Sequence, residues 1–307
     1  MTESKILCGD AAEVLKSLPQ GSANMCVTSP PYFGLRNYGE ANQIGTEETP
    51  EEYIGRLTKV FDEVYRVLID DGTLWVNIGD TYANKHCGLA KQKDLIGIPW
   101  ILAFALRECG WYLRSDIIWH KINALPEAVK DRPAKCYEHI FLLAKSPRYY
   151  FDYKALEQPI KPVTEARYTR GRSGKTKYSV SPLGQKIDMN TQAITDEKRK
   201  MRRCKDVWEV STNSYRMDEH FAMFPERLIE PCILAGSREG GLVLDPFFGS
   251  GTTGAAAKRL GRSYIGIDIN PRYLEKAEER ISNVIPENLH ESEADLEGKT
   301  TAGGGTI

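Results

Sequence analysis

The spacing of hydrophobic and polar residues along the chain predicts alternating strands and helices. Short apolar runs that end at glycine, proline or aspartate are typical of buried strands, and they occur at residues 4–8, 23–27, 73–78, 111–119, 139–144, 241–245 and 263–268. Apolar residues three and four positions apart indicate helices at 11–18, 51–68, 98–109 and from Pro225 to about residue 235. This alternation predicts an α/β fold with a doubly wound, mostly parallel sheet.

Three segments depart from this pattern. No long helical stretch separates the strands at 111–119 and 139–144, which predicts an antiparallel hairpin at the sheet edge with a mobile loop at 124–133. Periodicity disappears from about residue 151 to 215, apart from a charged helix or arm expected at 196–205. Residues 286–307 are polar and rich in glycine, so we expect a disordered tail there.

The strand at 23–27 leads into the run Ser29-Pro30-Pro31-Tyr32. Two consecutive prolines fix the backbone and keep Ser29 out of the helical region, so the loop is stiff. The stiffness aims the Ser29 hydroxyl and the Pro30 carbonyl at one point, with the Tyr32 ring beside them. An exocyclic amine on a nucleobase needs two such acceptors and an aromatic face. The alternative interpretation is that the run is only a turn that ends the strand, and that the aromatic ring of Tyr32 has no role in binding.

A second motif follows the strand at 241–245 and reads Pro246-Phe247-Phe248-Gly249-Ser250-Gly251-Thr252-Thr253-Gly254. Glycines let the backbone approach a ligand, and a helix N-terminus favours polar or anionic groups. Asp268 ends the next strand, 19 residues after Gly249, where an acid can bind both hydroxyls of a ribose. The spacing G-x-G-x-x-G also occurs in nicotinamide and flavin sites. However, a dinucleotide fold would need its remaining strands after this unit, and the sequence that follows the strand at 263–268 has room for only one further helix.

In this order, the two motifs resemble those of the amino-group DNA methyltransferases of the permuted β class, over about residues 4–284. The resemblance implies a permuted Rossmann-like methyltransferase fold with a basic target-recognition insertion. The implied organisation is a catalytic half at 1–150, the insertion at 151–215, a cofactor-binding half at 216–285 and a tail at 286–307. It further implies S-adenosylmethionine as the cofactor, double-stranded DNA as the substrate, and a cognate restriction endonuclease as a candidate partner.

The resemblance also assigns residues to roles. A methyl group would move from the cofactor to the exocyclic amine of a base flipped out of the duplex. The catalytic residues would be Ser29, Pro30, Pro31 and Tyr32. The cofactor site would comprise Asp10, Phe221, Pro225, Asp245, Pro246, Phe247, Gly249, Ser250, Gly251, Thr252 and Asp268. Asp10 equally suits a helix N-cap. Serine rather than aspartate at position 29 favours cytosine N4 as the target, with adenine N6 as the alternative.

The net charge of −1 conceals a strong asymmetry. Residues 154–205 hold 14 Lys and Arg against 5 Asp and Glu, a local balance of +9. A basic segment in an otherwise acidic chain suits phosphate binding, although a solvated loop would have the same composition. The candidate DNA-binding residues are Arg167, Arg170, Arg172, Lys175 and Lys177.

Composition limits the classes of function. No apolar run approaches the length of a membrane span, and no signal-peptide core follows Met1, so we expect no membrane partner. Seven cysteines without C-x-x-C spacing fit free thiols in a reducing cytoplasm, and no metal site is expected. We expect a monomer or homodimer. An RNA methyltransferase, an NAD-dependent oxidoreductase and a catalytically silent DNA-binding relative remain as alternatives.

Overall fold

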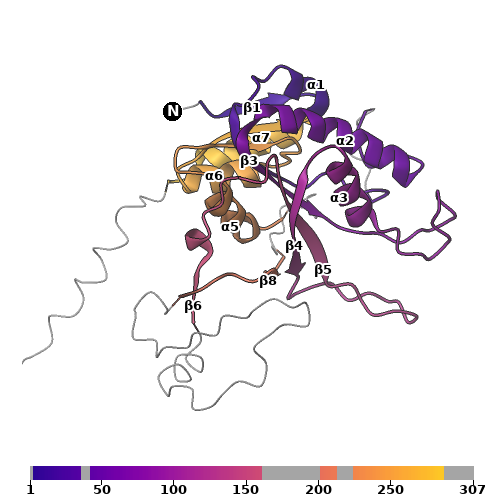
Figure 1. Ribbon diagram of the computed structural model, residues 1–307. Coiled ribbons are helices and arrows are strands. Elements are labelled where there is room, and N and C mark those ends of the chain that lie inside the picture. Colours follow the sequence, from indigo (N-terminus) through magenta and orange to yellow (C-terminus); the bar gives the residue numbers. More distant parts are fainter. Residues whose placement is uncertain (1–2, 36–41, 161–200, 213–223, 287–307) are drawn as a thin grey trace, which may run out of the picture. The chain divides into compact units, whose positions relative to one another are not determined.

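A computed structural model describes residues 3–35, 42–160, 201–212 and 224–286 of the chain (Figure 1). Its main sheet has the strand order β1-β10-β9-β2-β3-β5-β4-β8. The strands are β1 (Lys5–Cys8), β2 (Ala23–Thr28), β3 (Leu68–Ile78), β4 (Tyr112–His120), β5 (Tyr137–Ala144), β8 (Val207–Glu209), β9 (Leu242–Asp245) and β10 (Ser263–Asp268). From β1 to β3 all neighbours are parallel, whereas β5 is antiparallel to both β3 and β4.

Helices cover both faces of this sheet, which confirms the doubly wound, mostly parallel α/β fold. One layer holds α1 (Ala11–Lys16), α2 (Pro50–Val67) and α3 (Ile98–Glu108), and the other holds α5 (Glu226–Gly236), α6 (Thr252–Arg259) and α7 (Pro271–Ser282). The predicted apolar face of α2 is buried through Leu57, Phe61 and Val64. Within the described residues, no helix combines the length and the apolar character that crossing a bilayer requires.

The boundary between α2 and β3 lies earlier than the sequence predicts. The helix ends at Val67, and Leu68 is already extended, so Asp71 and Gly72 lie inside β3 rather than before it. The pairing of β2 with β3 shifts register just after Ala23. A side chain at Gly72 would come within 3.1 Å of the Asn24 carbonyl oxygen, so glycine permits the close approach of the two backbones at this irregularity.

The predicted antiparallel hairpin forms from β4 and β5, but its place in the sheet differs from the prediction. β5 lies inside the sheet between β3 and β4, and β4 pairs on its other side with β8 in parallel register, Ile118 with Val207. The three residues of β8 come from the stretch that shows no periodicity. A strand of this length is too short to produce a recognisable alternation.

Residues Tyr153–Lys205 form a second compact unit. Its described part contains a short 3₁₀ helix (Lys154–Leu156) and the antiparallel strands β6 (Gln158–Pro159) and β7 (Met201–Arg202). The Arg202 guanidinium donates to Gln158 Oε1 at 2.8 Å across this pair. The described end of the segment 196–205, expected as a charged helix or arm, thus contains a strand.

Phe248 links the loop after β9 to the sheet and to the α6–α7 layer. Its ring lies directly over Gly266 of β10, where an added Cβ would be 2.3 Å from the ring. Gly254 in α6 faces the same ring, with a Cβ position 2.6 Å away. Leu274, Ala277 and Ile281 of α7 complete the cluster around Phe248.

We expect Gly266→Ala to lower the free energy of unfolding by about 1–3 kcal/mol, because the new methyl group would overlap Phe248. Gly55→Ala in α2 is the control, since no atom of the described residues lies within 4 Å of its Cβ position. That variant should be neutral or more stable by about 0.5–1 kcal/mol. Urea unfolding measures both, and a Gly266→Ala protein as stable as the wild type would contradict this packing.

Candidate functional site

The two loops that carry the motifs follow the carboxyl-terminal ends of neighbouring strands, at the same end of the sheet. β2 and β9 are parallel and adjacent, with Met25 opposite Val243 and Cys26 opposite Leu244. The next helix after β2, α2, lies in one layer, whereas α6, which follows β9, lies in the other. A crevice where successive connections diverge to opposite faces is the usual ligand site of such sheets. The structure therefore places Ser29 and the glycine-rich loop on either side of this point.

Asp245 joins the two loops through its side chain, which is 1% exposed. Its Oδ1 accepts hydrogen bonds from the Thr28 hydroxyl at 2.5 Å and from the Phe247 N–H at 3.0 Å. Its Oδ2 accepts from the Thr253 hydroxyl in α6 at 2.5 Å. Burial raises the pKa of Asp245 to about 6, partly offset by these hydrogen bonds. Sequence reasoning assigned Asp245 to the cofactor site, but did not reveal that it binds the residue next to Ser29.

The two glycines at the turn of the second motif have different roles. Both have left-handed backbone conformations, with φ of 51° at Gly249 and 78° at Gly251. A Cβ at Gly251 would lie 2.7 Å from the Ala277 Cβ, so this glycine lets α7 pack closely. In the described part of the chain, no atom lies within 4 Å of the Cβ position of Gly249. The space needed for the approach of a ligand is therefore at Gly249.

Ser250 and Thr252 contact a residue that sequence reasoning missed. Arg280 in α7 donates to the Thr252 hydroxyl at 2.8 Å and to the Ser250 carbonyl oxygen at 3.3 Å. Ser250 and Thr252 are both buried. Since α7 carries no motif, its sequence gives no signal for this contact. Arg280 thus fixes the turn that opens α6.

Asp268 and Asp10 lie at the ends of adjacent strands, beside the same turn. Asp268 Oδ2 accepts from the Gly249 N–H at 2.8 Å, and its Oδ1 accepts from the Asn270 N–H at 2.9 Å. The Gly9 N–H donates to the Asp268 carbonyl oxygen at 3.0 Å. Asp10 caps α1 by accepting from the Glu13 N–H at 3.1 Å. Two carboxylates at the same end of the sheet, next to the uncrowded Gly249, suit a ligand with hydroxyl and amino groups.

The remaining predicted cofactor residues differ in their placement. Pro225 is buried and precedes α5 as its N-cap residue, rather than lying in its first turn. Pro246 is buried, and Phe247 is partly buried against the core on the α1–α3 side. Phe221 lies outside the described residues.

The Ser29–Tyr32 loop is held from two directions. The Tyr53 hydroxyl of α2 donates to the Pro31 carbonyl oxygen at 2.7 Å. The Tyr32 ring rests against Gly79, where a Cβ would be 2.7 Å from Cε2. Among the described residues, none donates to the Pro30 carbonyl oxygen. Within this loop Ser29 is partly exposed, whereas Pro30 is buried.

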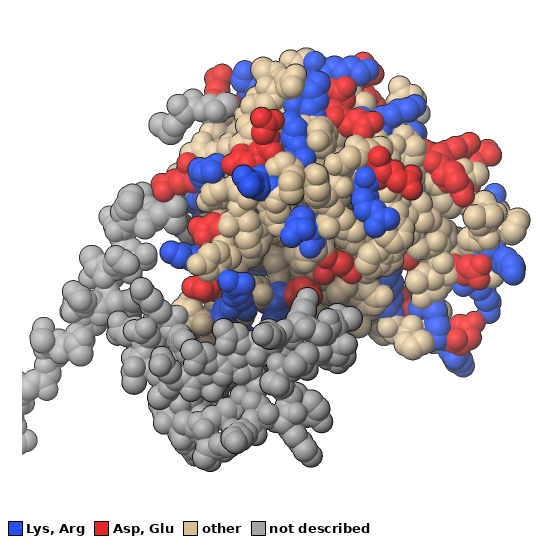
Figure 2. All heavy atoms as spheres, viewed as in Figure 1, with Lys and Arg blue, Asp and Glu red and all other residues tan. Residues whose placement is uncertain are grey.

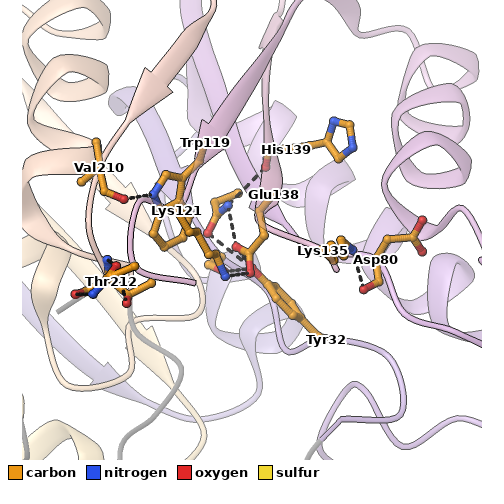
Figure 3. A network of polar contacts seen from close by, with 12 residues as sticks. Tyr32, Asp80, Trp119, Lys121, Lys135, Glu138, His139, Val210 and Thr212 are labelled. Atoms are coloured by element: carbon orange, nitrogen blue, oxygen red, sulfur yellow. Dashed lines mark hydrogen bonds and ion pairs between the residues drawn. The ribbon is translucent and has the colours of Figure 1, made fainter. Parts of the chain in front are cut away.

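Beyond Tyr32 lies a polar network that neither motif indicates (Figure 3). The Tyr32 hydroxyl donates to Glu138 Oε2 of β5 at 2.7 Å, and Glu138 Oε1 forms an ion pair with Lys121. Burial and the neighbouring Glu138 raise the pKa of Tyr32 well above its usual value. Trp119, two residues before Lys121, is buried and donates to the Val210 carbonyl oxygen at 2.8 Å. The described residues contain no group of His, Cys, Asp and Glu that could hold a metal ion.

Charged side chains are mixed in sign over the face of the molecule in Figure 2. Lys and Arg alternate there with Asp and Glu, so the described residues present no single-sign surface on this face. The candidate DNA-binding residues Arg167, Arg170, Arg172, Lys175 and Lys177 lie outside the described residues.

Comparison with known proteins gives consistent matches along most of the chain. A family model described as DNA methylase (N6_N4_Mtase) matches residues 23–279. The Type II methyltransferase M.Cfr9I of Citrobacter freundii is 44% identical over 302 residues, which cover 90% of this chain and 88% of that protein. The Type II methyltransferase M.SmaI of Serratia marcescens is 42% identical over 298 residues, 90% of each chain.

Solved structures have the same fold. TTHA0409 of Thermus thermophilus, complexed with S-adenosyl-L-methionine, is 26% identical with a TM-score of 0.61, over 92% of this chain and 95% of that one. The cytosine-N4-specific PvuII DNA methyltransferase has a TM-score of 0.66 at 20% identity, over 97% of this chain and 91% of that one.

The raised pKa of Asp245 predicts a specific pH dependence of stability. Its value of about 6 in the folded chain exceeds the ordinary 3.8, so the unfolded chain loses this proton more readily. The folded chain gains stability because it holds this proton more tightly than the unfolded chain does. This gain is fully present below about pH 4 and is lost as the pH rises through about 6, a change on the order of 3 kcal/mol. The free energy of unfolding of the wild type, relative to Asp245→Asn, should therefore fall between about pH 4 and pH 7.5. Urea unfolding of both proteins checks this. A difference that does not vary with pH would contradict the assignment.

Proposed function

This chain belongs to the DNA methylase family of the N6/N4 type, and we propose that it methylates the N4 atom of cytosine in duplex DNA. It is a Type II DNA methyltransferase of the restriction–modification kind, with S-adenosylmethionine as its cofactor. The observation that carries the site assignment is the adjacency of β2 and β9. It brings the Ser29 loop and the glycine-rich loop to the same end of the sheet, where Asp245 joins them.

The cofactor side of the proposed site uses the groups beside the turn at Gly249. Asp268 would accept hydrogen bonds from the two ribose hydroxyls. Asp10 lies nearby, just after the end of β1, the strand that pairs with β10. The open Cβ position of Gly249 lets the backbone approach the ligand. The cofactor supplies an electrophilic methyl group on a sulfonium. Asp245, Ser250 and Thr252 are buried, unlike the partly exposed Asp268, and would act by shaping the loop through their contacts with protein groups.

On the substrate side, Ser29 Oγ and the Pro30 carbonyl oxygen would accept the two N–H bonds of the amine. Acceptors in these positions would favour a pyramidal nitrogen with its lone pair directed at the methyl carbon. The N–CH3 bond would form as the S–CH3 bond breaks, and the surplus proton would leave the nitrogen after the transfer. Fixed dipoles that require no rearrangement supply the catalysis. The partly exposed Tyr32 would stack on the flipped base.

The basic insertion is proposed to select the DNA sequence. Two observations support this role. The local charge of residues 154–205 suits contacts to phosphates, and in the sequence these residues stand between the two halves of the methyltransferase fold. A cognate endonuclease would recognise the same DNA sequence.

Asp268→Ala should weaken the binding of S-adenosylmethionine, because two charge-assisted hydrogen bonds, each worth about 1.5–3 kcal/mol, would be lost. Isothermal titration calorimetry measures the dissociation constant. Glu275→Ala, which removes an exposed acid of α7, is the matched control and should bind normally. Equal affinity of Asp268→Ala and wild type would refute the ribose assignment.

The methylated atom is determined by digesting the product DNA to nucleosides and resolving them by mass spectrometry. We expect N4-methylcytosine, because Ser29 offers a neutral hydroxyl acceptor rather than a carboxylate. Standards of C5-methylcytosine and N6-methyladenine identify the alternatives. A product that contains only N6-methyladenine would reverse the choice of base, whereas the proposed amine site would remain the same.

A further inference from the structure

Glu138 is a buried acid next to the catalytic loop, yet it belongs to neither motif. It lies in β5, 106 residues from Tyr32 in sequence, and is 9% exposed. Three donors surround its carboxylate. The Tyr32 hydroxyl and the Asn77 side-chain amide approach Oε2 at 2.7 and 3.2 Å, and the Lys121 ammonium pairs with Oε1 (Figure 3). A carboxyl group that receives donors on both oxygens acts as a pure acceptor.

The hydrogen bonds around Tyr32 have a defined direction. A phenol has one hydrogen, and the contact with Glu138 at 2.7 Å is far shorter than the contact with Asn77 Oδ1 at 3.4 Å. The hydrogen therefore points to Glu138, and the phenol oxygen is left as an acceptor. The Ser29 hydroxyl lies 3.5 Å from this oxygen, a long contact in which the serine is the donor because the phenol hydrogen is already engaged by Glu138. With its own hydrogen directed towards Tyr32, Ser29 Oγ has lone pairs for an incoming N–H.

We propose that Glu138 is a positioning residue for methyl transfer, which acts through Tyr32 to orient the Ser29 hydroxyl as an acceptor for the target amine. The inference rests on the proposed function of the Ser29–Tyr32 loop. It explains how a neutral hydroxyl can serve where charge is useful. The negative charge of Glu138 lies two hydrogen bonds behind the serine, through the Tyr32 hydroxyl, and polarises this chain of donors. The same contact fixes the Tyr32 ring, whose opposite support is Gly79.

The position of Glu138 follows from the sheet order. β5 is antiparallel to β3, and His139 is opposite Ile78, so the neighbouring Glu138 lies beside the end of β3. β2, which leads into the Ser29 loop, is the next strand on the other side of β3. Glu138 thus reaches the loop across the end of β3, whereas the next residue in its strand, His139, bonds to Asp116 Oδ1 at 2.8 Å.

A double-mutant cycle tests the proposal. Glu138→Gln removes the charge, and Tyr32→Phe removes the hydroxyl while keeping the ring. The rate of methyl transfer is measured in a single turnover, with saturating labelled S-adenosylmethionine and duplex DNA. We expect each variant to be slower by about tenfold or more. The double variant should be about as slow as the slower single variant, because both substitutions break the same chain.

Controls separate positioning from structural damage. Asp116→Asn removes an acid from the same hairpin and should keep the wild-type rate. The dissociation constant of the cofactor, measured by calorimetry, should be unchanged in all variants, so that the effect is confined to the transfer step.

Three results would overturn the proposal: a wild-type rate in Glu138→Gln, a wild-type rate in Tyr32→Phe, or rate losses that multiply in the double variant. If Glu138→Gln does not fold, the Tyr32→Phe rate decides alone. If the wild type itself transfers no methyl group to DNA, the proposed function fails instead.

Discussion

The buried carboxylate of Asp245 is the interaction on which the arrangement of the site depends. It has no cationic partner among the groups that contact it, and three donors from three points of the chain satisfy it. Thr28 ends the strand before Ser29, Phe247 lies in the glycine-rich loop, and Thr253 lies in the first turn of α6. Hydrogen bonds to a charged group contribute about 1.5–3 kcal/mol each, which partly offsets the desolvation that raises the pKa of Asp245. One side chain therefore sets the spacing between the two loops.

Around this centre, each loop is fixed by its own contacts. The glycine-rich loop is held by Arg280, by the Phe248 ring over Gly266 and by the close contact of Gly251 with α7. The Ser29–Tyr32 loop is held by Tyr53 and Glu138. The side chains that hold the loops come mainly from helices and strands, and such support fixes a site more accurately than loop contacts alone. This agrees with a reaction in which positioning and fixed dipoles supply the catalysis.

Much of this could be predicted from the sequence because the information is local. Apolar runs bounded by turn residues located β2, β9 and β10, and the two motifs located the loops that follow β2 and β9. The long-range contacts could not be predicted. Glu138 meets Tyr32 only because β5 lies beside β3, and the short-range pattern of the hairpin does not specify that order. Likewise, nothing in the sequence of α7 indicates that Arg280 reaches Thr252, and β8 is too short to show alternation.

In the arrangement that we propose, the cofactor methyl group and the target amine meet above the ends of β2 and β9. A crystal structure of the full chain with duplex DNA and S-adenosylhomocysteine tests this arrangement. We expect a flipped base stacked on Tyr32, with its amine nitrogen hydrogen-bonded to Ser29 Oγ and the Pro30 carbonyl oxygen. The cofactor sulfur should face that nitrogen, and its ribose should contact Asp268. A base or a cofactor bound elsewhere than at the carboxyl-terminal ends of these strands would contradict this arrangement.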